Sequence, residues 1–206
     1  MLGLPKATEM SKQLPKKAVY AKFQMNTAAK DKMDADISRI MIVNEIMPGK
    51  INIPAGNEVS SIFVLLVTLK KKEFDEKTIA LLSKLIPQNI LFVLEYGDKS
   101  KLAVYHTKLM QTVWKKTEEQ YIEIKGLNLD KVWENIVVLI GNINIEQGKS
   151  LDEQIAIDEK RQKIEKEIDR LEKLARAERQ PKKKYKLVQR IRAYQKQSGL
   201  MHKEID

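Results

Sequence analysis

The sequence of 206 residues contains no cysteine and only two histidines. A chain without cysteine has no disulfide, no iron–sulfur cluster and no cysteine nucleophile. Two isolated histidines, His106 and His202, do not support a histidine-based zinc site. The sequence therefore predicts a fold held by its own hydrophobic core, which a chain of this length can bury. No metal and no cofactor are predicted.

Long hydrophobic runs and catalytic motifs are also missing. No stretch approaches the roughly 20 apolar residues of a membrane-spanning helix. Residues 1–15 lack the layout of a signal peptide, so we expect a cytoplasmic protein. There is no glycine-rich phosphate loop and no Ser/His/Asp spacing typical of a hydrolase. The sequence therefore indicates a non-enzymatic protein with no catalytic residues.

Positive charge is abundant, and it is concentrated near the C-terminus. The chain has 38 Lys and Arg residues against 28 Asp and Glu residues, a net charge of +10. Residues 176–196 alone hold nine basic residues against Glu178, a net charge of +8. Such a concentration favours a polyanion or an acidic protein surface as the partner.

The first part of the chain alternates strand and helix patterns. Strands are expected at residues 16–23, 37–46, 61–69, 90–96, 101–106 and 121–125, and the fourth and fifth should form a hairpin. The run at 61–69 is almost continuously apolar, which indicates a strand buried on both faces. Helices are expected at residues 27–35, 76–86 and 128–140. The pattern predicts an α+β domain over residues 1–147, with a mixed sheet and packed helices.

The C-terminal part reads as two helices. Ser150 and Glu153 form a capping box, and neither Gly nor Pro follows until Pro181. Apolar residues then recur at nearly heptad spacing, as in the seam of a coiled coil; they are Ile157, Ile164, Ile168, Leu171 and Ala175. We expect helices from Leu151 to about Glu178 and from Pro181 to about Gln197. Residues 148–206 would then form a second domain, an antiparallel, coiled-coil-like helical hairpin.

The second of these helices is amphipathic. Leu187, Val188, Ile191 and Tyr194 fall on one arc, and most of the charged residues fall on the opposite side. The candidate binding residues are Arg176, Arg179, Lys182, Lys183, Tyr185, Lys186, Arg190, Arg192 and Lys196. This set suits nucleic-acid phosphates, an acidic protein surface, or a solvated face with no partner. Tyr185 could stack on a base.

Secondary candidates follow the buried strand at its end. These residues are Lys70, Lys71 and Lys72. They either belong to a binding site, as residues at strand ends often do, or are simply charged residues of the loop that follows the strand. A restriction-type nuclease core needs an acidic residue on one strand and the pattern Glu-x-Lys on the next strand, so that the carboxylates hold Mg²⁺. Asp36 precedes the first of these strands, and Lys70 ends the second. Thr68 stands where that second carboxylate is required. An inactive or divergent relative of such a nuclease is therefore the third functional hypothesis.

Several short segments carry a resemblance to a known family. They are residues 1–6 (MLGLPK), 14–17 (LPKK), 36–40 (DISRI), 85–92 (LIPQNILF), 126–130 (GLNLD) and 177–181 (AERQP). Together they resemble the family known as domain of unknown function 4391, over essentially the whole chain. The resemblance implies an accessory role in DNA processing, beside helicases and DNA methyltransferases of restriction or phage-defence type. It supplies no catalytic residues.

These observations lead to one main hypothesis and one competitor. The main hypothesis is an accessory subunit of a restriction-modification or antiviral defence complex. Its basic C-terminal hairpin would contact DNA or a larger helicase or methyltransferase partner. The competing hypothesis is a protein–protein adaptor, a homo-oligomer that associates through the long helix.

Overall fold

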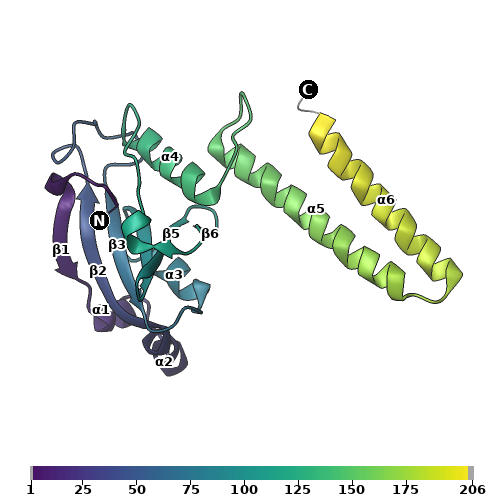
Figure 1. The fold of residues 1–206 in the computed structure, drawn as a ribbon, viewed down its shortest axis with the longest axis horizontal. Coiled ribbons are helices and arrows are strands. Elements are labelled where there is room, and N and C mark those ends of the chain that lie inside the picture. The colour runs from purple at the N-terminus through teal and green to yellow at the C-terminus, as the bar shows by residue number, and fades with distance from the viewer. Residues whose placement is uncertain (1, 204–206) are drawn as a thin grey trace. The chain divides into compact units, whose positions relative to one another are not determined.

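A computed structural model describes the backbone of residues 2–203 and the side chains of residues 2–197. The chain forms two compact units, Met1–Ile143 and Asn144–Asp206. The first combines a mixed sheet with helices and the second is helical (Figure 1), which confirms the predicted α+β class with a helical C-terminal region.

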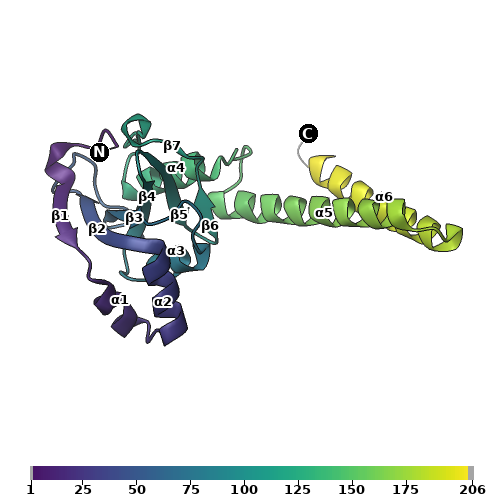
Figure 2. The ribbon, with the colours of Figure 1, turned by 60° about the horizontal axis from the view of Figure 1, so that its bottom comes forward.

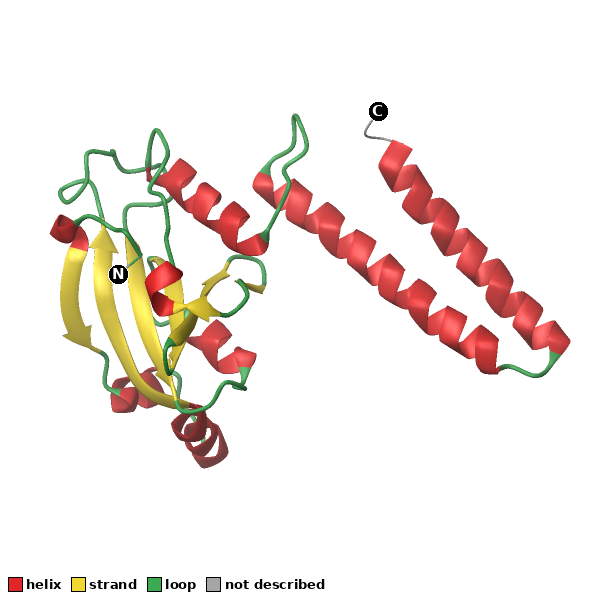
Figure 3. Ribbon diagram, in the orientation of Figure 1, coloured by secondary structure: helices red, strands yellow, loops and turns green. Residues whose placement is uncertain are grey.

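The sheet of the first unit has seven strands. They are β1 (Glu9–Gln13), β2 (Ile37–Ile46), β3 (Ile62–Leu69), β4 (Asn89–Tyr96), β5 (Lys99–Tyr105), β6 (Leu109–Gln111) and β7 (Lys115–Lys116). Strands β1 to β6 follow one another across the sheet, and β7 pairs with β5. All pairs are antiparallel except β3 and β4, which are parallel and are connected through helix α3 (Figure 3). The predicted hairpin is confirmed as β4 and β5.

Three helices pack on one face of this sheet. They are α1 (Lys16–Lys22), α2 (Thr27–Asp36) and α3 (Glu76–Leu82). Val19, Met33 and Ile79 from these helices join Leu65 and Phe92 of the central strands in one hydrophobic cluster. Val64 and Leu66 alternate with the β3 residues of that cluster, and they are buried as well. The prediction that this strand is buried on both faces is therefore confirmed.

Helix α4 (Leu129–Gly141) contacts β5 and β6. Its N-cap is Asn128, whose side chain accepts a hydrogen bond from the amide of Lys131. Val132, Ile136 and Ile140 recur on its buried side, so the helix predicted over residues 128–140 is confirmed. The helix ends at Gly141, and its C-cap Asn142 adopts the left-handed conformation that often closes a helix.

Two predicted strands are wrong. Residues 16–22 form helix α1, because helical spacing brings Val19 and Phe23 together against the hydrophobic cluster. Residues 121–125 form no regular element. Only Ile122 of that segment is fully buried, its amide donates to the carbonyl of Leu2, and Tyr121 is 64% exposed. Short edge strands β1, β6 and β7 were not predicted.

Helix α3 is shorter than expected. It ends at Leu82 rather than at Ile86. The amides of Lys84 and Leu85 donate to carbonyls three residues back, at Leu81 and Leu82. Tight turns of this kind replace the last helical turn before Pro87.

The second unit is an antiparallel pair of helices, α5 (Leu151–Ala177) and α6 (Pro181–Lys203), which run side by side (Figure 2). The capping box of Ser150 and Glu153 is present, as predicted. Leu171 and Ala175 of α5 pack with Ile191 of α6. Ile168, Leu187 and Tyr194 surround this small core.

Asp130, in the first turn of α4, holds the loop before β3. Its carboxylate accepts hydrogen bonds from the amides of Asn57 (2.7 Å), Glu58 (3.2 Å) and Val59 (2.8 Å). A side chain at Gly56 would collide with this carboxylate, since a Cβ there would lie 2.0 Å from Oδ1. The hydrogen bonds from these amides hold the pKa of Asp130 below its usual value.

We expect Asp130→Asn to lower the melting temperature by a few degrees at neutral pH. The amide nitrogen of the variant cannot accept hydrogen bonds from the loop. The contribution of Asp130 is complete above its unfolded pKa of about 3.9 and is lost as the pH falls through its lower folded pKa. The difference in melting temperature between wild type and variant should therefore be largest at pH 7 and should shrink as the pH falls below about 3.9. Asp98→Asn, at an exposed turn position, is the control and should leave the melting temperature unchanged.

Candidate functional site

The predicted binding residues lie at exposed positions of the helical hairpin, with Arg176 on α5, Arg179 in the turn and the others on α6. The apolar arc of α6, from Leu187 to Tyr194, faces α5. The opposite side therefore faces solvent. Every predicted residue is exposed; they are Arg176, Arg179, Lys182, Lys183, Tyr185, Lys186, Arg190, Arg192 and Lys196. We call this set the basic face.

Most charges of the basic face form no ion pair within the described residues. Arg176 pairs with Glu172 at 3.4 Å, and Arg190 lies 3.8 Å from Glu167. Glu167 already binds Arg170 through both of its oxygens. Within the part of the chain that the structure describes, the remaining cations form no ion pair; they are Arg179, Lys182, Lys183, Lys186, Arg192 and Lys196. Helix α6 itself contains no acidic residue.

The start of α6 adds to this positive potential. Pro181 is the first helical residue, and Lys182, Lys183 and Lys184 follow it in the first turn. The free amides at a helix N-terminus carry partial positive charge, so cations in this turn are unfavourable and a bound anion is favourable. The amino-terminal end of α6 is therefore electrostatically suited to phosphate groups.

Tyr185 is the one aromatic residue of the basic face. Its ring is 62% exposed. Its hydroxyl accepts a hydrogen bond of 2.7 Å from the side-chain amide of Gln189, one turn further along the helix. Tyr185 is thus tied to its own helix by its hydroxyl and remains largely exposed to solvent.

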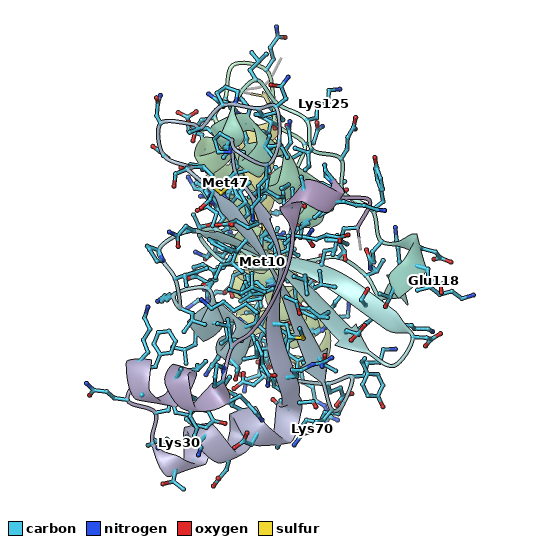
Figure 4. The ribbon with its side chains drawn as sticks, turned by 90° about the vertical axis from the view of Figure 1, so that its left-hand side faces the viewer. Met10, Lys30, Met47, Lys70, Glu118 and Lys125 are labelled. Carbon is cyan, nitrogen blue, oxygen red and sulfur yellow. The ribbon has the colours of Figure 1, made fainter. Side chains whose placement is uncertain are left out.

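The secondary candidates lie at one end of the sheet and have different surroundings. Figure 4 shows Lys70 at the end of the sheet near Lys30, away from Met47 and Lys125. Lys71 pairs at 2.7 Å with Asp36, whose side chain is only 3% exposed. Lys72 lies over the ring of Trp114, with Nζ 6.0 Å from the ring centre. The structure thus assigns Lys71 to an internal ion pair and brings Lys72 to an aromatic residue.

Trp114 also contacts a lysine that sequence patterns did not single out. The Nζ atom of Lys101 lies 5.2 Å from the Trp114 ring centre and 4.8 Å from that of Phe74. Partial burial lowers the pKa of Lys101, and the charge of Glu76 opposes this shift. Lys101 therefore lies beside two aromatic residues, Phe74 and Trp114, which pack against the hydrophobic cluster of the first unit.

The geometry around Asp36 bears on the nuclease hypothesis. The amide of Lys70 donates to the carbonyl of Asp36 at 2.8 Å, so the two strand ends do meet. Glu95 of β4 lies beside Thr68, with 3.4 Å between Oε2 and Oγ1; this carboxylate was missed because only the parallel register of β3 and β4 reveals it. The carboxylate of Asp36 is occupied by Lys71 and by the amide of Asp75. Among the described residues, no three acidic or histidine side chains gather in a way that could hold a metal ion.

These features define the class of protein: an α+β domain with a mixed sheet, joined to a helical hairpin whose second helix presents unpaired cations. The chain belongs to the family described as Domain of unknown function (DUF4391), whose model matches residues 2–197. The resemblance found in the sequence is thus confirmed at the level of the family. Comparison with curated proteins and with solved structures gives no match. In the described part of the chain, no helix is long and apolar enough to span a membrane.

Proposed function

We propose that this protein is a non-enzymatic accessory subunit of a DNA-processing complex of restriction-modification or phage-defence type. In this proposal the basic face of α6 binds DNA. The observation that supports it is the set of six exposed cations that form no ion pair within the described residues. Unpaired cations along one helix face are the electrostatic arrangement expected of a phosphate-binding surface.

The dimensions of the helix agree with this role. Lys182 and Lys196 are fourteen residues apart, which corresponds to about 21 Å along a helix. Phosphates of one DNA strand are spaced about 3.4 Å along the axis, so this length matches about six of them. Each phosphate contact releases counterions and therefore strengthens binding at low salt.

The adaptor hypothesis has less support from the hairpin. That hypothesis requires the apolar seam of α5 to be available to a second copy of the chain. Leu171 and Ala175 instead pack on Ile191 of the same chain. A homo-oligomer through this part of the seam would require the hairpin to open. Following the family resemblance, we propose a helicase or methyltransferase as the protein partner. Co-expression with candidate partners followed by gel filtration tests that part of the proposal.

Titration with duplex DNA at several salt concentrations tests the proposed function directly. We expect fluorescence anisotropy to show binding at 50 mM salt, with affinity falling steeply towards 200 mM. The logarithm of the binding constant should decrease linearly with that of the salt concentration, with a slope of about −0.9 for each phosphate contact. Six contacts predict a slope of about −5. Absence of binding at 50 mM salt, or binding that does not depend on salt, would contradict the proposal.

A further inference from the structure

A shallow hollow lies on the helical hairpin next to the turn between its helices. It has a volume of about 420 Å³. Its lining residues come from the end of α5, the turn and the first half of α6; they are Leu174, Glu178, Lys183, Lys186, Leu187 and Arg190. The size falls within the range of small-molecule binding sites. The hollow borders the basic face and shares three of its cations.

The floor of this hollow is apolar. Leu174 is 46% exposed, although it lies on a helix whose other leucines are shielded by their neighbours. Leu187 lies across from it on α6 and is only half-buried against the small core. Exposed leucine next to a groove costs free energy in water, and a planar apolar ligand would reduce that cost.

The rim of the hollow is cationic. Lys183 and Lys186 form no ion pair within the described residues, and Arg190 has only the long contact with Glu167. Glu178 is the one acidic residue of the lining. Its carboxylate accepts a hydrogen bond of 2.8 Å from the amide of Gln180 and is thereby engaged in the turn. The hollow therefore combines an apolar floor with a positively charged edge.

A ligand that fits this combination has an apolar planar group beside negatively charged groups. An unstacked nucleobase with its flanking phosphates has this chemistry. Bases in a duplex are paired and stacked, so they could enter the hollow only after the duplex opens. We infer that the protein prefers single-stranded nucleic acid and that one unstacked base occupies the hollow over Leu174 and Leu187. This inference rests on the proposed function and specifies the form of nucleic acid that the same face binds.

Three DNA ligands of equal length separate this inference from simple phosphate binding. They are a single strand, the corresponding duplex, and an abasic strand that keeps the phosphates but lacks the bases. We expect anisotropy titrations of the full chain to show tighter binding to the single strand than to either of the others. Loss of the apolar contact between one base and the two leucines corresponds to about a tenfold change in affinity. Equal affinity for the natural and the abasic strand would overturn the inference.

Leu174→Ser provides the matched variant. It removes the more exposed of the two leucines of the floor and leaves every cation of the basic face in place. We expect the ratio of single-strand to duplex affinity to fall about tenfold, because less apolar surface is buried against the base. Leu139→Ser, at a leucine of α4 that is 55% exposed, should leave this ratio unchanged. Circular dichroism should show the same helix content for both variants, which separates an effect on the hollow from unfolding.

The outcomes also distinguish the two proposals. If the protein binds DNA in a salt-dependent way but without preference for the single strand, the inference about the hollow fails and the proposed function stands. If no DNA binds at 50 mM salt, the proposed function fails as well. If a glutamate-rich helical peptide binds, Leu174→Ser weakens it and single strands show no preference, the hollow is a protein-docking site and the inference is wrong.

Discussion

Replacing Lys182, Lys183, Lys186 and Arg190 with alanine is expected to weaken DNA binding at least a hundredfold at about 0.1 M salt. These four residues lie on one side of α6, and all are exposed. If each contacts one phosphate, their removal lowers the slope of the salt dependence by about 3.6. The expected loss is large because the contributions of the four contacts multiply, and a factor of about three from each already gives a hundredfold.

The matched control removes the same amount of charge from the first unit. Lys99, Lys115, Lys116 and Lys125 are exposed and form no ion pair within the described residues. Their replacement with alanine should change the affinity much less and should leave the slope nearly unchanged. Equal losses in both variants would mean that binding follows the net charge and not the basic face. If the variant of the helical hairpin binds DNA with the affinity of the wild type, the proposed function is contradicted.

Leu171→Ala should separate the two helices of the hairpin. Leu171 is fully buried and packs on Ile191, in a small core whose buried members among the described side chains are Leu171, Ala175 and Ile191. Truncation of a buried leucine to alanine costs about 2–5 kcal/mol. A core this small has few other contacts to compensate for the lost packing. We therefore expect the backbone amides of α6 to lose their protection from hydrogen exchange, while the first unit stays folded.

Hydrogen exchange of the backbone amides measures this effect region by region. Amides of α6 should exchange much faster in Leu171→Ala than in wild type, and those of β3 and β4 should be unchanged. Leu139→Ala changes an exposed leucine of α4 and should alter stability by less than about 0.5 kcal/mol. If α6 keeps its protection in Leu171→Ala, the hairpin does not depend on this core, and our account of its stability is wrong.

Helices with strong local signals could be predicted from the sequence. Ser150 and Glu153 define the start of α5, and Asn128 defines the start of α4, because side-chain caps act within one turn of the chain. Residues 16–22 show the opposite case. Over such a short stretch their apolar residues fit the repeat of a helix and the repeat of a strand equally well. Only packing on the sheet selects the helix.

The proposed binding surface could likewise be predicted only in part from the sequence. The exposed position of the cations could be predicted, because the apolar arc of α6 fixes which side must face another helix. The hollow could not, since Leu174 and Leu187 are thirteen positions apart and meet only when α5 and α6 pack. The proximity of Glu95 and Thr68 also depends on a strand register that no local pattern reveals.

The sequence by itself determined the α+β class, the helical C-terminal region and the concentration of positive charge in residues 176–196. These properties follow from periodicity, capping and composition, which act over a few residues. Only the tertiary structure decided the edge strands β1, β6 and β7, the internal ion pair of Lys71 with Asp36, and the hollow beside the basic face. Each of these depends on partners that are distant in the sequence, so the physical cause lies in packing and strand pairing and not in the local chain.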